Sequence, residues 1–153
     1  MRKFTFALSL LAVAFTAGVA WSQQAPAARP RAAAPAAPAA SVKGVATPMQ
    51  IMKTMTIPFS DVVFMAGSEP PKDQKGWTNV QEQAIALAEA GNLLMVGGRS
   101  KGPEWMRMAR AQVDAAEAAA KAAAAKNGDR LSTAADTLYE TCANCHKKYM
   151  PNK

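Results

Sequence analysis

The chain has 153 residues, a formal net charge of +7, and only two cysteines and one histidine. This length suits one domain or at most two, and the cysteine and histidine counts exclude a disulfide-dense scaffold and a multi-zinc protein. The sequence pI of about 9.7 leaves nucleic acid, an acidic membrane or an acidic protein as candidate partners until the charges are placed along the chain.

The N-terminal segment has the layout of a secretory signal peptide. Arg2 and Lys3 precede an apolar run that ends at Ala20, and the small residue Ser22 follows. We expect cleavage after Ser22, which would remove residues 1–22, leave no membrane span and place the protein in the periplasm. The alternative is an uncleaved anchor, since the apolar run is at the short edge of a transmembrane span.

Residues 23–46 are rich in alanine and proline and show no apolar period. Proline removes backbone donors, and alanine buries too little surface to offset the entropy of ordering, so we predict a flexible linker. A role as a spacer or a docking arm remains an alternative to a plain tether. The linker contains Arg29, Arg31 and Lys43, so residues 47–153 hold 13 basic and 11 acidic side chains and are nearly neutral.

Residues 47–153 show helical periodicity in four segments and no strand pattern. The expected helices span residues 49–67, 77–96, 103–127 and 129–149. Pro58 lies inside the first of them, where we expect a kink or a split, whereas Pro103 and Gly128 lie at positions typical of helix ends. The short connections predict an all-α fold, an antiparallel up-and-down four-helix bundle over residues 47–153.

The strongest chemical signal is the run Cys142-Ala143-Asn144-Cys145-His146 in the last expected helix. Helical spacing places both thiols and the imidazole on one side, because Cys145 and His146 each follow Cys142 by about one turn. Two thiols so spaced can form thioether bonds to the vinyl groups of a haem while the imidazole binds the iron. We therefore expect one covalently attached haem c, with Cys142 and Cys145 as its attachment points and His146 as the proximal iron ligand.

Three other uses of the same residues are weaker. A thioredoxin-like dithiol accompanies a βαβ pattern, which the sequence lacks. A zinc site would need a fourth ligand, and a structural disulfide would leave the adjacent histidine without a role.

A helical chain with C-A-N-C-H-K-K-Y near its end resembles the class II c-type cytochromes, the cytochrome c-prime family and its low-spin relatives. The Met52-Lys53 pair and the phrase L-A-E-A-G-N-L-L in the second expected helix add to this resemblance. It implies a non-enzymatic protein that carries single electrons between redox partner proteins, and dimerisation is common in the family. We do not expect nucleic-acid binding, since the cations of the helical part form no single stripe.

The resemblance also implies where the sixth iron ligand lies. In the low-spin relatives it is a methionine early in the first helix, which makes Met52 the expected distal ligand and Met55, one turn further on, the reserve. The alternative is a five-coordinate, high-spin cytochrome c-prime that binds small gas ligands such as nitric oxide. High-spin members often carry a first-helix arginine near the haem propionates, which this sequence lacks. The candidate cations here are Lys53, Arg99, Lys101, Arg107 and Arg110.

Overall fold

The computed structural model describes residues 42–150, so the predicted signal peptide and residues 23–41 of the predicted linker lie outside the described residues. All regular structure within 42–150 is helical, and no strand forms there, which confirms the predicted fold class. The elements are α1 (Pro48–Ile51), the π-helical segment η1 (Met52–Thr56), α2 (Ile57–Ser68), α3 (Gln74–Met95), α4 (Pro103–Ala124) and α5 (Gly128–Tyr149).

The three long helices begin at recognisable capping residues. Asp73 Oδ1 accepts a hydrogen bond of 2.7 Å from the Gly76 N–H at the start of α3, and Asn127 Oδ1 accepts one of 2.9 Å from the Arg130 N–H at the start of α5. Pro103 opens α4 behind Gly102, whose φ of 104° suits glycine. Short connections between these ends reverse the chain direction from one helix to the next.

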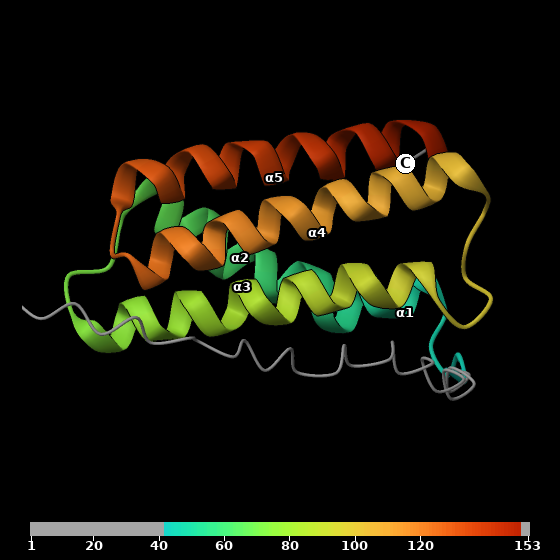
Figure 1. Ribbon diagram of the computed structural model, residues 1–153, viewed down its shortest axis with the longest axis horizontal. Coiled ribbons are helices and arrows are strands. Elements are labelled where there is room, and N and C mark those ends of the chain that lie inside the picture. Colours follow the sequence, from blue (N-terminus) through green and yellow to red (C-terminus); the bar gives the residue numbers. More distant parts are fainter. Residues whose placement is uncertain (1–41, 151–153) are drawn as a thin grey trace, which may run out of the picture. The chain divides into compact units, whose positions relative to one another are not determined.

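The helices form the predicted antiparallel four-helix bundle (Figure 1). The segment α1–η1–α2 acts as one member, and α3, α4 and α5 are the other three. Contacts link α2 to α3, α3 to α4, α4 to α5 and α5 to α2, so each member packs against two neighbours around a shared interior.

The expected disruption at Pro58 is a π-helical segment and not a split. Pro58 has no N–H to donate, and its ring crowds the carbonyl of the residue one turn earlier, so a regular α-helix is strained there. The backbone instead forms a wide turn, in which the Ile57 N–H donates to the Met52 carbonyl five residues earlier. The helix therefore continues through Pro58, and the wide turn includes Met52 and Thr56.

The buried side chains form two clusters along the bundle. The larger one includes the fully buried Val63, Leu87, Leu131 and Leu138, together with many alanines of α4. The smaller one consists of Ile51, Ala90, Leu94, Trp105 and Ala109. Small residues let the helices approach closely at several points of this interior.

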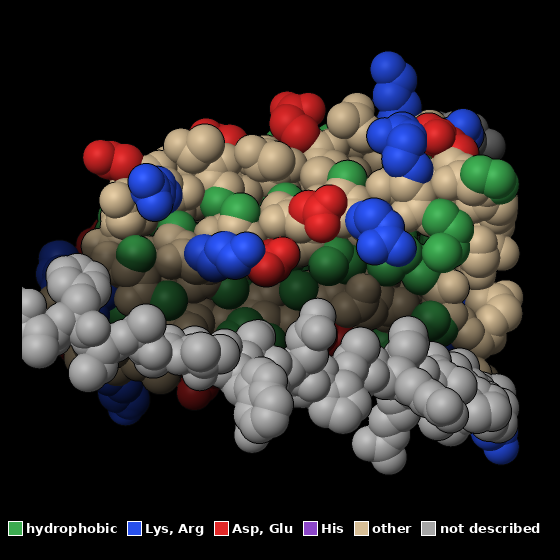
Figure 2. Space-filling view, viewed as in Figure 1, with side chains coloured by type: hydrophobic (Ala, Val, Ile, Leu, Met, Phe, Trp, Pro, Cys, Tyr) green, Lys and Arg blue, Asp and Glu red, His purple; other side chains and the backbone are tan. Residues whose placement is uncertain are grey.

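Charged side chains of both signs are interspersed on the face shown in Figure 2. Charges also pair along α4, where Lys121 Nζ lies 2.7 Å from Glu117 Oε1. This face therefore shows no uniformly basic stripe.

None of the helices in the described range combines the length and the apolar character needed to cross a bilayer.

Candidate functional site

A cavity of about 350 Å³ lies between the two buried clusters and is lined by side chains from all four members of the bundle. Its volume falls within the range of about 300–1,000 Å³ that is typical of ligand and cofactor sites. Leu94, Trp105 and Ala109 of the smaller cluster line it, and so does Phe64, which packs against the larger cluster. The cavity therefore lies at the level of the bundle where α5 carries Cys142 and Cys145.

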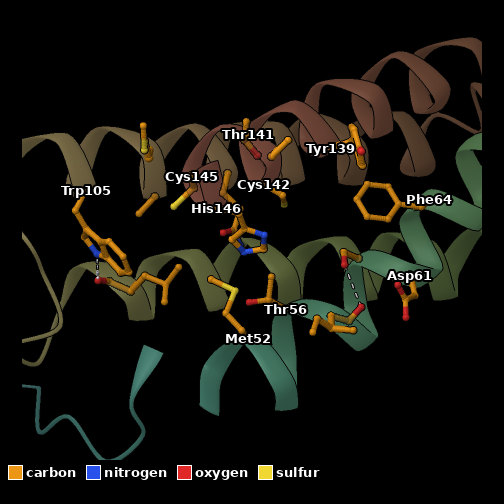
Figure 3. A pocket seen from close by; sticks show the side chains of 17 residues that line it. Met52, Thr56, Asp61, Phe64, Trp105, Tyr139, Thr141, Cys142, Cys145 and His146 are labelled. Carbon is orange, nitrogen blue, oxygen red and sulfur yellow. Dashed lines mark hydrogen bonds between the residues drawn. The ribbon is translucent and has the colours of Figure 1, made fainter. Parts of the chain in front are cut away.

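Helix α5 places Cys142, Cys145 and His146 together on the wall of this cavity (Figure 3). Both cysteines are half-buried and free, and His146 is exposed. The one-turn spacing predicted from the sequence therefore brings the two thiols and the imidazole to one side of the helix, facing the bundle interior.

Met52 lies on the wall that faces His146 (Figure 3). It also lines an adjoining cavity of about 280 Å³, together with Cys145, His146 and Tyr149. Met55 packs against the smaller buried cluster and lines neither cavity. Of the two methionines that the sequence singles out, the structure brings Met52 to the site and leaves Met55 outside it.

Burial controls the chemistry of the two thiols. Loss of hydration raises the pKa of the Cys142 thiol, which a hydrogen bond with Thr141 partly offsets and the nearby Cys145 increases. Loss of hydration also raises the pKa of the Cys145 thiol, against the opposing effect of Lys101. A redox-active C-x-x-C pair has a lowered thiol pKa, so the direction found here disfavours a dithiol exchange site.

A bare metal-ion site is also disfavoured. Within residues 42–150, no three side chains of the His, Cys, Asp or Glu type are arranged to hold a metal ion. Residues 142–146 therefore lack the closed set of four ligands that a structural zinc ion requires.

The candidate cations occupy different places. Arg99 donates from Nε to the Ala46 carbonyl at 2.7 Å, and from Nη1 to the Leu93 and Val96 carbonyls at 3.1 and 3.0 Å. Its charge therefore caps the C-terminal end of α3 and anchors the start of the described chain, away from both cavities.

Lys101 is the candidate that lies beside the site. Its Nζ is 5.0 Å from the centre of the Trp105 ring and 5.5 Å from that of Tyr149, and it lines the cavity that adjoins the cysteines. Arg107 instead pairs with Glu104, with 2.7 Å between Nη2 and Oε1. Lys53 and Arg110 are exposed and line neither cavity.

Trp105 stands where the two cavities meet. Its Nε1 donates to the Leu94 carbonyl at 2.8 Å, which fixes the indole plane, and its ring meets that of Tyr149 edge to face at 5.0 Å. This ring therefore forms a rigid part of the wall beside Cys145 and His146.

Sequence reasoning missed three buried polar residues of the site, Thr56, Ser60 and Gln112. Gln112 had a signal, because it is a polar residue on the apolar face of α4. Thr56 and Ser60 had one in their helical spacing from the buried Val63. The Thr56 hydroxyl is buried without a hydrogen-bond partner among the described residues.

No protein-family model matches the chain, and no curated protein matches it.

Proposed function

We propose that the protein is a monohaem c-type cytochrome of the class II kind, which carries single electrons. The observation that supports this most directly is the position of Cys142, Cys145 and His146 on one wall of an internal cavity, with Met52 facing them. A pair of thiols one turn apart, an imidazole beside them and a thioether opposite form the donor set that a covalently bound haem requires.

The residues present fit a haem in three respects. The cavity wall is mostly apolar, which suits the macrocycle, and the two thiols lie on the same side as the imidazole. Lys101 supplies a cation beside Cys145, where it would pair with the propionates. The buried hydroxyl of Thr56 has no hydrogen-bond partner within the described protein, so it is free to serve a bound group or one of that group's ligands.

In this proposal the haem supplies the one-electron chemistry, and the chain supplies its position and surroundings. Cys142 and Cys145 would attach the group to α5, and His146 and Met52 would bind its iron. The bundle holds His146 on α5 and Met52 on η1, so each of these two side chains is kept in place by its own helix. The packed wall around Trp105 limits the access of water to the site.

Met52 favours electron transfer over gas binding. A five-coordinate cytochrome c-prime leaves the position opposite its histidine without a protein ligand, whereas here a thioether occupies the facing wall. The same proposal places the chain in the periplasm after removal of residues 1–22, with residues 23–46 as its tether and other redox proteins as its partners. No bond of a substrate is broken in this function, so the protein is not an enzyme.

The proposal is tested on the full chain, produced in cells that can attach haem c. We expect the purified protein to keep its haem stain on a denaturing gel and to show a low-spin spectrum with a far-red sulfur-to-iron band. The double variant Cys142→Ser with Cys145→Ser should lose the stain. Asn144→Ala is the matched control, because Asn144 is exposed on the same turn.

Two results would contradict the proposal. A wild-type chain without covalent haem would remove the cytochrome assignment. A stained chain with a high-spin spectrum would replace electron transfer by the gas-binding alternative.

A further inference from the structure

Thr56 has a hydroxyl group that the folded chain buries but does not pair. The residue is 4% exposed, and Oγ1 has no hydrogen-bond partner among the described residues. Neighbouring hydroxyls are paired with the helix backbone: Thr54 Oγ1 donates to the Gln50 carbonyl at 2.8 Å, and Ser60 Oγ donates to the Ile57 carbonyl at 3.0 Å. An unpaired buried hydroxyl is costly, so its persistence points to a hydrogen bond that forms only when the cavity holds its ligand.

The carbonyl that Thr56 would ordinarily use already has a donor. A threonine in an α-helix donates to a carbonyl three or four residues earlier. Four residues before Thr56 is the Met52 carbonyl, which accepts from the Ile57 N–H in η1, and the Thr56 side chain lines the cavity. Figure 3 shows Thr56 beside Met52, on the wall that faces His146.

Two other polar side chains of the cavity have partners in the backbone. Gln112 Nε2 makes a long contact of 3.5 Å with the Leu87 carbonyl, and Thr141 Oγ1 donates to the Leu138 carbonyl at 2.7 Å. Haem propionates do not suit Thr56 as a partner, because charged carboxylates need water or a cation. Lys101, the cation beside the site, lines the adjoining cavity, which Thr56 does not reach.

Two acceptors of this helical member also line the cavity. Asp61 follows Thr56 by five residues and its carboxylate is exposed, whereas Met52 precedes Thr56 by four residues on the same face of the helix and is half-buried. We propose that Thr56 is a positioning residue, whose hydroxyl donates a hydrogen bond to the Met52 thioether when that thioether binds the iron. This inference rests on the proposed function, since it requires the haem. The sulfur has two lone pairs, so one can face the iron and the other the hydroxyl.

Such a hydrogen bond would act on the iron through its ligand. Methionine is flexible about three bonds, and a fixed donor beside its sulfur restricts it to the orientation that binds. The same bond draws electron density from the sulfur, which favours the reduced iron and raises the reduction potential.

The test compares three variants of the haem-loaded full chain. Thr56→Val removes the hydroxyl and keeps the shape, and Thr56→Ser keeps the hydroxyl. Thr54→Val is the control, because Thr54 lies in the same π-helical segment but is exposed and lines neither cavity. Circular dichroism of each variant establishes that the bundle is folded before the site is measured.

The readouts are azide binding to the ferric protein, the far-red sulfur-to-iron band and the reduction potential. In Thr56→Val we expect azide to displace Met52 with about fivefold higher affinity, the equivalent of one lost hydrogen bond of about 1 kcal/mol. The band should shift and the potential should fall. Thr56→Ser and Thr54→Val should both behave like the wild type.

Two outcomes would overturn the inference while the proposed function stands. If Thr56→Val leaves azide affinity, band and potential unchanged, the hydroxyl does not act on Met52. If Thr56→Val weakens azide binding, the hydroxyl serves an incoming anion and not the methionine. Failure of the proposed function is seen separately, as a wild-type protein without covalent haem.

Discussion

Replacing Met52 by alanine tests the sixth iron ligand directly, because Met55 provides a matched control. Both methionines are half-buried and belong to η1, so their removal takes similar apolar surface from the same helix. They differ in what they line, since Met52 lines the cavity and Met55 does not, while both pack against the smaller buried cluster. A difference in visible spectrum between Met52→Ala and Met55→Ala therefore reports on the cavity and not on the stability of the helix.

The burial of the two methionines determines the loss of stability that both variants should share. A methionine that is fully buried loses about 2–5 kcal/mol on replacement by alanine, and partial exposure reduces this to about 1–2 kcal/mol for each variant. Urea unfolding of the haem-free chain should give nearly equal losses for the two variants. In the haem-loaded protein, Met52→Ala should lose additional stability, because the bond between thioether and iron disappears as well.

Visible spectroscopy gives the decisive measurement. Met52→Ala should lose the far-red sulfur-to-iron band, become high-spin in the ferric state and bind azide readily, whereas Met55→Ala should keep the wild-type spectrum. Retention of the band and of the reduction potential in Met52→Ala would refute the assignment of Met52. Loss of the band in Met55→Ala alone would transfer the role to Met55.

Three further predictions concern the bundle and its surface. Arg99→Ala should lower the free energy of unfolding by about 2–3 kcal/mol, because three backbone carbonyls lose a charged donor; an effect no larger than that of Arg110→Ala in urea unfolding would contradict this. Gly67→Ala should lower the free energy of unfolding by about 1–3 kcal/mol, since its Cβ would lie 2.6 Å from that of Ala135. Adding Ala135→Gly to the same chain should recover much of that loss, as measured by thermal unfolding. Lys101→Gln should lower the reduction potential by less than about 60 mV, and a shift that does not shrink at high salt would argue against a propionate pair.

The sequence predicts the helices well because their ends carry local signals. The start of α4 at Pro103 is where the sequence predicts it, and α3 ends at Met95, one residue before the predicted end and just before Gly97, whose φ is 64°. The predicted end at residue 127 is late, because α4 ends at Ala124, Lys126 takes the left-handed conformation and Gly128 opens α5. The grouping of Cys142, Cys145 and His146 on one face also follows from helical spacing alone.

Other features depend on contacts between distant parts of the chain. The sequence alone gives no sign that Arg99 is more than a surface cation. Its hydrogen bond to the Ala46 carbonyl joins residues 53 positions apart, so no local pattern predicts it. Pro58 predicts a disturbance but not its kind, which is the π-helical turn of η1. Likewise, Met52 and Met55 are equivalent by residue type, and only the position of the cavity, which Met52 lines and Met55 does not, separates them.

The separation of the buried side chains into two clusters affects the order in which the parts of the bundle fold. Val63, Leu87, Leu131 and Leu138 are fully buried, and none of them lines the cavity, so their packing is complete without a ligand. One half of the bundle can therefore fold first and hold α5 in place. In the proposed cytochrome, Cys142 and Cys145 would then stay within reach of the attachment machinery in the other half. Amide hydrogens around Leu131 and Leu138 should exchange slowly in the haem-free chain, and those around Cys145 should become slow only in a haem-loaded chain.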